Sequence, residues 1–279
     1  MSKWYRTTRL RIPSPGGTMR LLLLRPTLNK KPPRETPGIL WIHGGGYTTG
    51  MPEMVYISRA LPLVKKYGAV VISPAYRLSH KAPYPAALED CYAALLYLKD
   101  NAATLGINPD QIMVGGESAG GGLTAALCML ARDQGEVRVA YQMPLYPMLD
   151  DRDTPSSRFN FEPMWNTPQN HRGWRLYLGK LWHTDNVPPY AAPARQTNYA
   201  GLPPAYTFVG RGEPFHDETL TFIENLRQAG VEASVDVYPF WYHGFDLVRA
   251  WNPRARRAAA VFEEHFRYAL AHYFAPQDS

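Results

Sequence analysis

The chain has 279 residues, of which 45% are hydrophobic, 13% aromatic and 19% charged, and this composition excludes a disordered or fibrous protein. A chain of this length is expected to form one large domain, residues 1–279, that carries an insertion. The net charge is +6, but the longest basic cluster, Asn29–Arg34, offers too few convergent cations to bind nucleic acid.

The cysteine content and the N-terminal sequence both indicate a cytoplasmic protein. Cys91 and Cys128 each lie in a helical pattern, so no disulfide framework is expected. The N-terminal residues lack the apolar stretch of a signal peptide, and Leu21–Leu24 is too short to span a bilayer. We therefore expect a cytoplasmic location and no insertion into a membrane.

The first part of the chain predicts four strands. Residues 4–12 and 19–25 are rich in β-forming residues and flank a turn at Pro13–Gly17, so they predict a hairpin. Two short apolar runs, Gly38–Ile42 and Ala69–Ser73, then predict buried strands.

Helices alternate with strands along most of the remaining chain. Apolar residues recur with a helical period from about Ala86 to Lys99. Strands that alternate with helices predict right-handed crossovers and a mostly parallel sheet flanked by helices, which is an α/β fold. The further elements expected are strands at Gln111–Gly115, near Val137–Met143, at Ala205–Gly210 and at Ala233–Tyr238, and helices up to Arg132, over about Asp217–Ala229 and over about Pro253–Tyr273.

The alternation stops from about Asp150 to Leu202, and residues 151–202 are interpreted as an insertion. Polar residues here alternate with large rings, among them Trp165, Trp174 and Trp182. Such a segment can fold over a concave apolar surface as a cap or lid. A small subdomain that packs its own rings is the alternative interpretation.

Gly116–Gly120 matches the pattern G-x-S-x-G between a predicted strand and a predicted helix. A serine at the tip of such a sharp turn projects its hydroxyl clear of the sheet, which makes Ser118 a candidate nucleophile. The N–H of Ala119, at the start of the helix, would point toward an anion that forms on the attacked carbonyl.

His43–Gly46 follows directly after the predicted strand Gly38–Ile42. Consecutive glycines suit a loop whose bare backbone approaches a ligand. The N–H groups of Gly44 and Gly45 are therefore candidate oxyanion donors, and His43 is expected to brace the loop rather than to transfer protons.

A serine hydroxyl needs a base, and the base needs a carboxylate that orients it. His243 lies just past the predicted strand Ala233–Tyr238, so it is the candidate base. The loop after the strand Ala205–Gly210 contains two acids, Glu213 and Asp217, and its sequence alone does not choose between them. All these loops follow the carboxyl ends of predicted parallel strands, where α/β sheets place their sites.

With these motifs in order, the chain resembles the hormone-sensitive-lipase-like branch of the α/β-hydrolases, bacterial esterases that carry an HGGG loop and a G-[DE]-S-A-G-G elbow. The resemblance covers roughly Thr18 to Phe245. Further matching motifs are Tyr76-Arg77-Leu78, Pro83–Asp90, Gly106–Pro109, Tyr190–Pro193 and Leu202–Pro204.

The resemblance implies which acid completes the triad. The acid motif of the family, an Asp-Pro pair followed by a bulky apolar residue and later by Asp-Glu, falls on Glu213–Glu218. By this match Glu213 is the triad acid, with glutamate in place of the usual aspartate, and Asp217 is the alternative. Family members commonly carry a helical cap before the first strand, whereas strand-like sequence begins here by Trp4, so a shortened N-terminal cap is expected.

The implied activity is that of a serine carboxylesterase that hydrolyses esters of small molecules through an acyl-enzyme, without a metal or other cofactor. The ring-rich insertion and the shortened cap suggest short acyl chains, from acetyl to about hexanoyl. Deacetylation of sugars, amidase or lactonase activity and a non-catalytic receptor for small molecules are the alternatives.

Gly120–Ala125 also satisfies G-x-G-x-x-A, but the acidic residue that a dinucleotide site requires is absent. The sequence leaves open whether the protein forms a homodimer.

Overall fold

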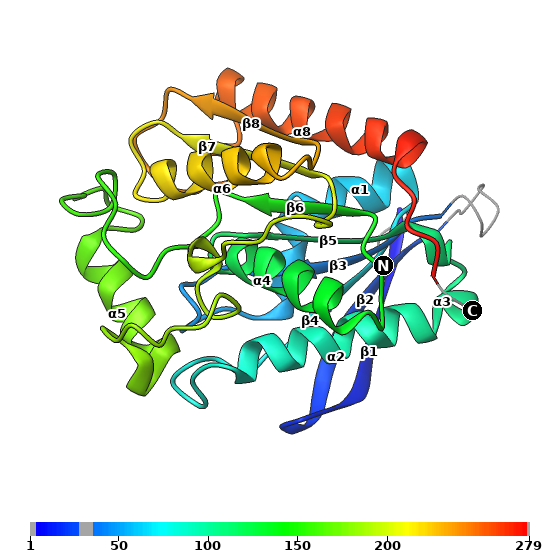
Figure 1. Cartoon of the computed structure of the whole chain (residues 1–279). Coiled ribbons are helices and arrows are strands. Elements are labelled where there is room, and N and C mark those ends of the chain that lie inside the picture. The colour runs from blue at the N-terminus through cyan, green and yellow to red at the C-terminus, as the bar shows by residue number, and fades with distance from the viewer. Residues whose placement is uncertain (1–3, 28–35, 278–279) are drawn as a thin grey trace.

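The computed structural model describes residues 4–27 and 36–277, so the basic cluster Asn29–Arg34 lies outside the described residues. Within these ranges the strands form one eight-stranded sheet in the order β1-β2-β4-β3-β5-β6-β7-β8 (Figure 1). The strands are β1 (Tyr5–Ser14), β2 (Gly17–Pro26), β3 (Gly38–Ile42), β4 (Val70–Pro74), β5 (Ile112–Glu117), β6 (Tyr141–Leu145), β7 (Ala205–Gly210) and β8 (Ala233–Tyr238).

The sheet is antiparallel at one edge and parallel elsewhere. β1 and β2 form the predicted hairpin, in which Ser14 pairs with Gly17, and β2 runs antiparallel to β4. The other neighbouring strands, from β4 to β8, are parallel to one another. The expected α/β architecture with a mostly parallel sheet is therefore confirmed.

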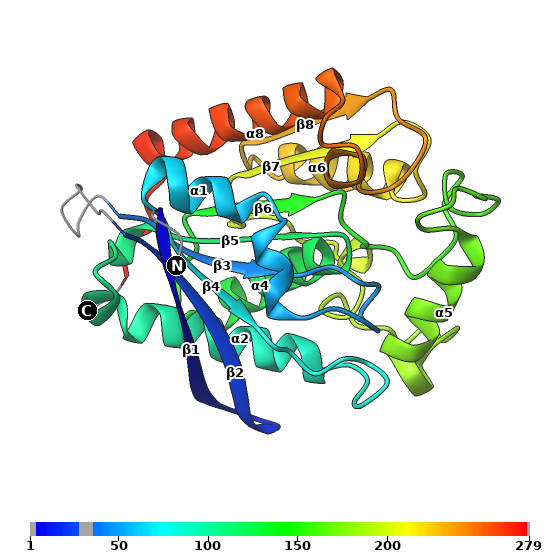
Figure 2. The ribbon, with the colours of Figure 1, turned by 180° about the vertical axis from the view of Figure 1, so that it is seen from behind.

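Helices cover both faces of the sheet. Figure 1 shows α2, α4 and α6 on the face toward the viewer, and Figure 2 shows α1 and α8 on the opposite face. The α-helices are α1 (Ala60–Tyr67), α2 (Ala86–Asp100), α3 (Ala102–Leu105), α4 (Ala119–Gln134), α5 (Thr167–Leu178), α6 (His216–Gln228), α7 (Phe245–Val248) and α8 (Pro253–His272), and the 3-10 helices are η2 (Pro52–Tyr56), η3 (Pro109–Gln111), η4 (Gly179–Leu181) and η5 (Pro193–Arg195). In the described ranges, no helix has the length and apolar character needed to cross a membrane.

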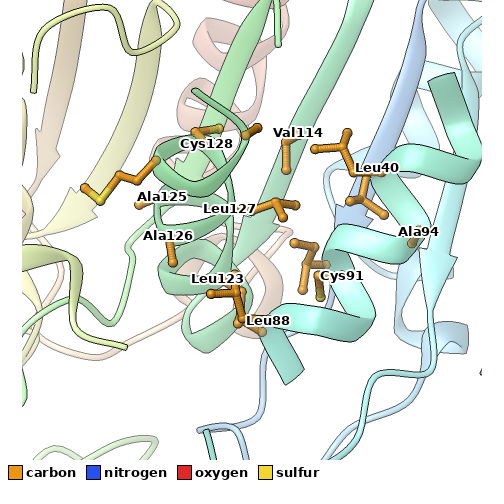
Figure 3. Close-up of a cluster of buried hydrophobic side chains, with 14 of the residues drawn as sticks. Leu40, Leu88, Cys91, Ala94, Val114, Leu123, Ala125, Ala126, Leu127 and Cys128 are labelled. Carbon is orange, nitrogen blue, oxygen red and sulfur yellow. The ribbon is translucent and has the colours of Figure 1, made fainter. Parts of the chain in front are cut away.

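Two apolar clusters fill the space between the sheet and its helices. Figure 3 shows part of the first cluster, in which Leu88 and Cys91 of α2 lie close to Leu123 and Leu127 of α4. Val114 of β5 is buried in the same cluster. This packing fixes α4 on the sheet, and it therefore fixes the turn between β5 and α4.

The sixth strand starts later than the sequence predicts. The apolar pattern predicts a strand near Val137–Met143, whereas β6 spans Tyr141–Leu145, so the prediction is wrong for residues 137–140. Val137 is buried in the core without belonging to a strand, and its burial produces the same apolar signal. β6 continues through Pro144, a residue type that usually argues against an internal strand.

The loops after β3, β5, β7 and β8 meet at one edge of the sheet, because these strands are parallel and their carboxyl ends lie side by side. The 151–202 segment follows β6 and contains α5. Both views show α5 beyond this edge, apart from the helices that cover the two faces (Figures 1 and 2). The architecture thus brings the candidate loops and the 151–202 segment to the same end of the molecule.

Candidate active site

Ser118 occupies the turn between β5 and α4 in a conformation that few residues other than glycine adopt. Its backbone has φ 60° and ψ −122°. Three hydrogen bonds hold this turn: the Ser118 N–H donates to the Leu145 carbonyl at 3.0 Å, and the Ser118 carbonyl accepts from the N–H groups of Gly122 at 2.9 Å and Met148 at 3.0 Å. Strain of this kind persists only where the surrounding structure imposes it, so the fold fixes the direction of the Ser118 side chain.

A continuous chain of hydrogen bonds links the side chains of Ser118, His243 and Glu213. The Ser118 Oγ lies 2.9 Å from Nε2 of His243, and Nδ1 of the same ring lies 2.5 Å from Oε2 of Glu213. The second oxygen of Glu213 accepts the Gly210 N–H at 2.9 Å. The three predicted residues, which are up to 125 positions apart, thus have the contacts that a nucleophile, a base and an orienting acid require.

Glu213 is completely buried. Burial raises the pKa of its carboxyl group, while His243 and the Gly210 N–H act in the opposite direction. The carboxylate form of Glu213 is therefore stabilised chiefly by its contact with the imidazole ring.

Asp217, the alternative acid, does not contact His243. Its Oδ1 lies 2.7 Å from Nδ1 of His216, and its Oδ2 accepts the Ser156 N–H at 2.9 Å. Asp217 therefore joins the start of α6 to the 151–202 segment, and the structure brings Glu213 rather than Asp217 to the imidazole ring.

Two aromatic rings fix the plane of the His243 imidazole. Tyr146 meets it edge-on with centroids 5.0 Å apart, and Phe215 does so at 4.9 Å. Neither ring was singled out from the sequence, although Phe215 is the bulky apolar residue of the acid motif. These contacts restrict rotation of the imidazole away from Ser118.

The glycine loop after β3 passes directly beside Ser118. A methyl group at Gly44 would lie 2.8 Å from the Glu117 carbonyl oxygen and 3.2 Å from Cβ of Ser118, so only glycine permits this approach. In the described part of the chain, the N–H groups of Gly44 and Gly45 donate no hydrogen bond to another residue. Ala119 is the first residue of α4, and its N–H has no partner within the helix. The three predicted oxyanion donors are therefore free to bind an anion beside Ser118.

His43 braces this loop from inside the protein. Its ring stacks on Tyr76 at 4.2 Å, and its Nδ1 donates to the Gly44 carbonyl at 2.8 Å. The Tyr76 hydroxyl donates in turn to the His43 carbonyl at 3.0 Å. Burial lowers the pKa of His43 to about 4, so the ring is neutral at physiological pH.

A buried polar cluster lies next to Ser118 in the chain, and as a cluster it was not predicted from the sequence. The carboxyl group of Glu117 accepts the indole N–H of Trp41 at 2.8 Å and the backbone N–H of Arg59 at 3.1 Å, and these contacts brace the turn that carries Ser118. The Arg59 guanidinium also lies 3.1 Å from the buried carboxylate of Asp246. Burial raises the pKa of Glu117 to about 8 and also raises the pKa of Asp246. Arg59 and Asp246 carry no local sequence signal, because they meet only in the folded chain.

Several buried acids brace the 151–202 segment and the chain next to it. Asp151 forms a bidentate pair with Arg195 at 2.6 and 2.8 Å. Glu218 of α6 accepts the N–H of Leu149 at 2.6 Å. Glu162 is also buried and contacts the His243 backbone, and nothing in the sequence singled it out. Among the residues that the structure describes, no group of three or more His, Cys, Asp or Glu side chains is arranged to hold a metal ion.

These features agree with comparisons to known proteins. A family model described as alpha/beta hydrolase fold matches residues 39–247, and the chain belongs to this family. The predicted resemblance to the hormone-sensitive-lipase-like branch is confirmed.

Individual relatives are named as esterases or as an acetyl-hydrolase. The esterase LipI of Mycobacterium tuberculosis is 33% identical over 213 residues, which are 76% of this chain and 66% of that protein. An acetyl-hydrolase of Streptomyces hygroscopicus is 30% identical over 235 residues, covering 83% of this chain and 75% of the relative. The solved structure of a bacterial heroin esterase superimposes with a TM-score of 0.90 at 35% identity, covering 97% of this chain and 86% of the other. The chain thus spans about two thirds of the length of LipI and more of the other two proteins.

Proposed function

We propose that this protein is a serine carboxylesterase that hydrolyses esters with short acyl groups, from acetyl to about hexanoyl. The observation that carries the proposal is the hydrogen-bonded chain from Ser118 through His243 to Glu213, which lies beside the free N–H groups of the glycine loop. The names of the relatives, which include esterases and an acetyl-hydrolase, support the same reaction class.

The proposed reaction has two steps. In the first, the Ser118 Oγ attacks the ester carbonyl carbon while Nε2 of His243 accepts the hydroxyl proton, and the carbonyl π electrons move to the oxygen. The tetrahedral intermediate then collapses, the alcohol leaves with the proton from His243, and an acyl-serine remains. In the second step His243 accepts a proton from a water molecule, and the water oxygen attacks the carbonyl carbon of the acyl-serine. The tetrahedral intermediate then collapses, the bond to the Ser118 oxygen breaks, and Ser118 regains its proton from His243 as the carboxylic acid leaves.

The oxyanion that forms in each step would be held by the N–H groups of Gly44, Gly45 and Ala119. Such donors act because they are already oriented before charge develops, and each one removed typically raises the barrier by about 2.7–4 kcal/mol. Glu213 would keep the imidazole in the tautomer with hydrogen on Nδ1 and would stabilise the imidazolium that forms transiently.

The preference for short acyl groups rests on the rings that fill the space beside the glycine loop. Tyr47 stacks on Tyr177 at 3.9 Å and lies 5.5 Å from Trp174, and all three are fully buried. The ring of Trp165 packs against Gly46. We propose that residues 151–202, which supply most of these rings, form a cap that limits the length of the acyl group.

A panel of p-nitrophenyl esters from acetate to dodecanoate tests the proposal. We expect hydrolysis of the acetate and butyrate, a decline beyond hexanoate, and no turnover above background for Ser118→Ala. A rate that climbs through the dodecanoate would contradict the chain-length proposal. Binding without turnover would contradict the enzymatic proposal, and faster cleavage of acetylated sugars, anilides or lactones would reassign the substrate class.

We also propose a cytoplasmic location and small-molecule esters as the partners. Both cysteines are buried as free thiols, which suits a reducing compartment. Fractionation of cells that produce the protein tests this location, and recovery in the secreted or membrane fraction would contradict it.

A further inference from the structure

Glu162, in the 151–202 segment, is a buried carboxylate that contacts the loop of the catalytic base. It is 3% exposed, and one of its oxygens, Oε1, accepts the backbone N–H of His243 at 3.2 Å. The same oxygen accepts the Trp165 N–H at 2.6 Å, while Oε2 accepts the Met164 N–H at 2.7 Å. Three backbone donors thus converge on one carboxylate that touches neither Ser118 nor the imidazole ring.

The contact with Trp165 extends this arrangement to the glycine loop. A methyl group at Gly46 would lie only 2.1 Å from the Trp165 ring, so that ring rests directly on the loop backbone. The Trp165 indole N–H donates to Asn170 of α5 at 3.3 Å, which fixes the ring from its other side. One carboxylate therefore holds both the backbone of the base and the residue that covers the oxyanion loop.

The neighbouring residue Asn160 links the same turn to the loop of the triad acid. Its side chain accepts the Glu162 N–H at 3.1 Å and donates to the Gly212 carbonyl at 3.0 Å, one residue before Glu213. The turn 160–165 therefore contacts three of the four loops at this edge, those that follow β3, β7 and β8.

We propose that Glu162 is a positioning residue that sets the His243 backbone relative to the oxyanion loop, so that the 151–202 segment is part of the catalytic apparatus as well as a cover for it. The inference rests on the proposed esterase function. A carboxylate suits this position because its two oxygens accept all three N–H donors, whereas a neutral amide can accept on one oxygen only. The charge also makes each of these hydrogen bonds stronger than a neutral one.

Kinetics of Glu162→Ala and Glu162→Gln with p-nitrophenyl acetate test this role against a matched control. Asp151→Asn is the control, because Asp151 is also a buried acid that joins two parts of the same segment through Arg195 but does not contact a catalytic loop. We expect Glu162→Ala to lower kcat about 100-fold, as a small displacement of a catalytic group does, with KM nearly unchanged. Glu162→Gln keeps one acceptor oxygen and should lower kcat about 10-fold, and Asp151→Asn should keep its kcat although its Tm falls.

A spectroscopic measurement tests the same inference without substrate. The proton between Nδ1 of His243 and Glu213 should give a far-downfield NMR resonance, which we expect to shift or broaden in Glu162→Ala and to stay in place in Asp151→Asn. Glu162 does not position the base if Glu162→Ala and Asp151→Asn lower kcat by the same factor. The same conclusion follows if Glu162→Ala keeps the wild-type kcat and the wild-type resonance. If Glu162→Ala does not fold, the comparison of Glu162→Gln with Asp151→Asn decides in the same way. Hydrolysis by Ser118→Ala at the wild-type rate would instead overturn the proposed function itself.

Discussion

The carboxylate of Glu213 reaches Nδ1 of His243 at 2.5 Å from a position with no exposed surface. The loop after β7 places this glutamate where a shorter acid is usual in the family. The second carboxylate oxygen of Glu213 accepts the Gly210 N–H at 2.9 Å. Each oxygen of the carboxylate therefore has a hydrogen-bond partner before any substrate binds.

Replacement of this acid should separate the two candidates identified in the sequence. We expect Glu213→Gln to lower kcat by about four orders of magnitude while the protein stays folded, because the amide no longer fixes the productive tautomer of His243. Asp217→Asn should retain nearly full kcat, since Asp217 contacts Ser156 and His216 instead. Initial rates with p-nitrophenyl acetate and circular dichroism provide the measurements. The opposite ranking of the two variants would show that Glu213 is not the orienting acid.

The closeness of Gly44 to the nucleophile predicts a second effect. Gly44→Ala would place a methyl group 2.8 Å from the Glu117 carbonyl and push the glycine loop away from Ser118. We expect kcat to fall about 100- to 1000-fold with little change in KM, because the oxyanion donors act mainly in the transition state. Thermal unfolding in parallel shows whether the fold is kept. A folded variant with the kcat of the wild type would contradict the assignment of these donors.

The buried Glu117 predicts that stability depends on pH between about 4.5 and 8. Burial raises its pKa in the folded protein from 4.5 to about 8, so the folded state keeps a proton that the unfolded state releases between these values. Stability should therefore fall as pH rises through this window, by at most roughly 1.4 kcal/mol per pH unit from this group. Urea unfolding at several pH values should show a smaller decline for Glu117→Gln than for the wild type. Identical slopes for the two proteins would mean that Glu117 is ionised when folded.

His43 predicts the opposite dependence on the acid side. Burial lowers the pKa of His43 from 6.5 to about 4. Between these pH values the imidazole is protonated in the unfolded state and neutral in the folded state. Stability should fall as pH drops from 6.5 toward 4, by roughly 3 kcal/mol in total from this ring. A variant that cannot titrate, His43→Asn, should lose less stability over this interval in the same urea measurements. An unchanged acid dependence would indicate that the ring becomes protonated without unfolding.

Most of the fold and the residues of the candidate site follow from local patterns. Apolar runs such as Gly38–Ile42 predict the buried strands, and the parallel arrangement then brings the loops after them to one edge. Ser118 and the glycine loop could be found because a sharp turn and a close backbone approach both require particular residues. The contact of Glu213 with His243, 30 positions apart, could be expected only through the family motif.

The features that the sequence did not predict depend on distant partners or on weak local signals. Glu162 meets His243 across 81 positions, so nothing near it in the chain marks it as special. Helix α5 was missed because it contains Gly173 and many polar residues. Its first turn does carry a capping box between Asn166 and Gln169, a signal that could have located it.

The two cysteines determine how the protein can be probed chemically. Cys91 and Cys128 lie inside the core, and burial raises the pKa of both thiols. Because the thiolate is the reactive form, maleimides and similar reagents should not modify either cysteine in the folded protein. A cysteine introduced at an exposed site such as Phe161 would then be the single point of attachment for a fluorophore or spin label, with no need to remove the native thiols.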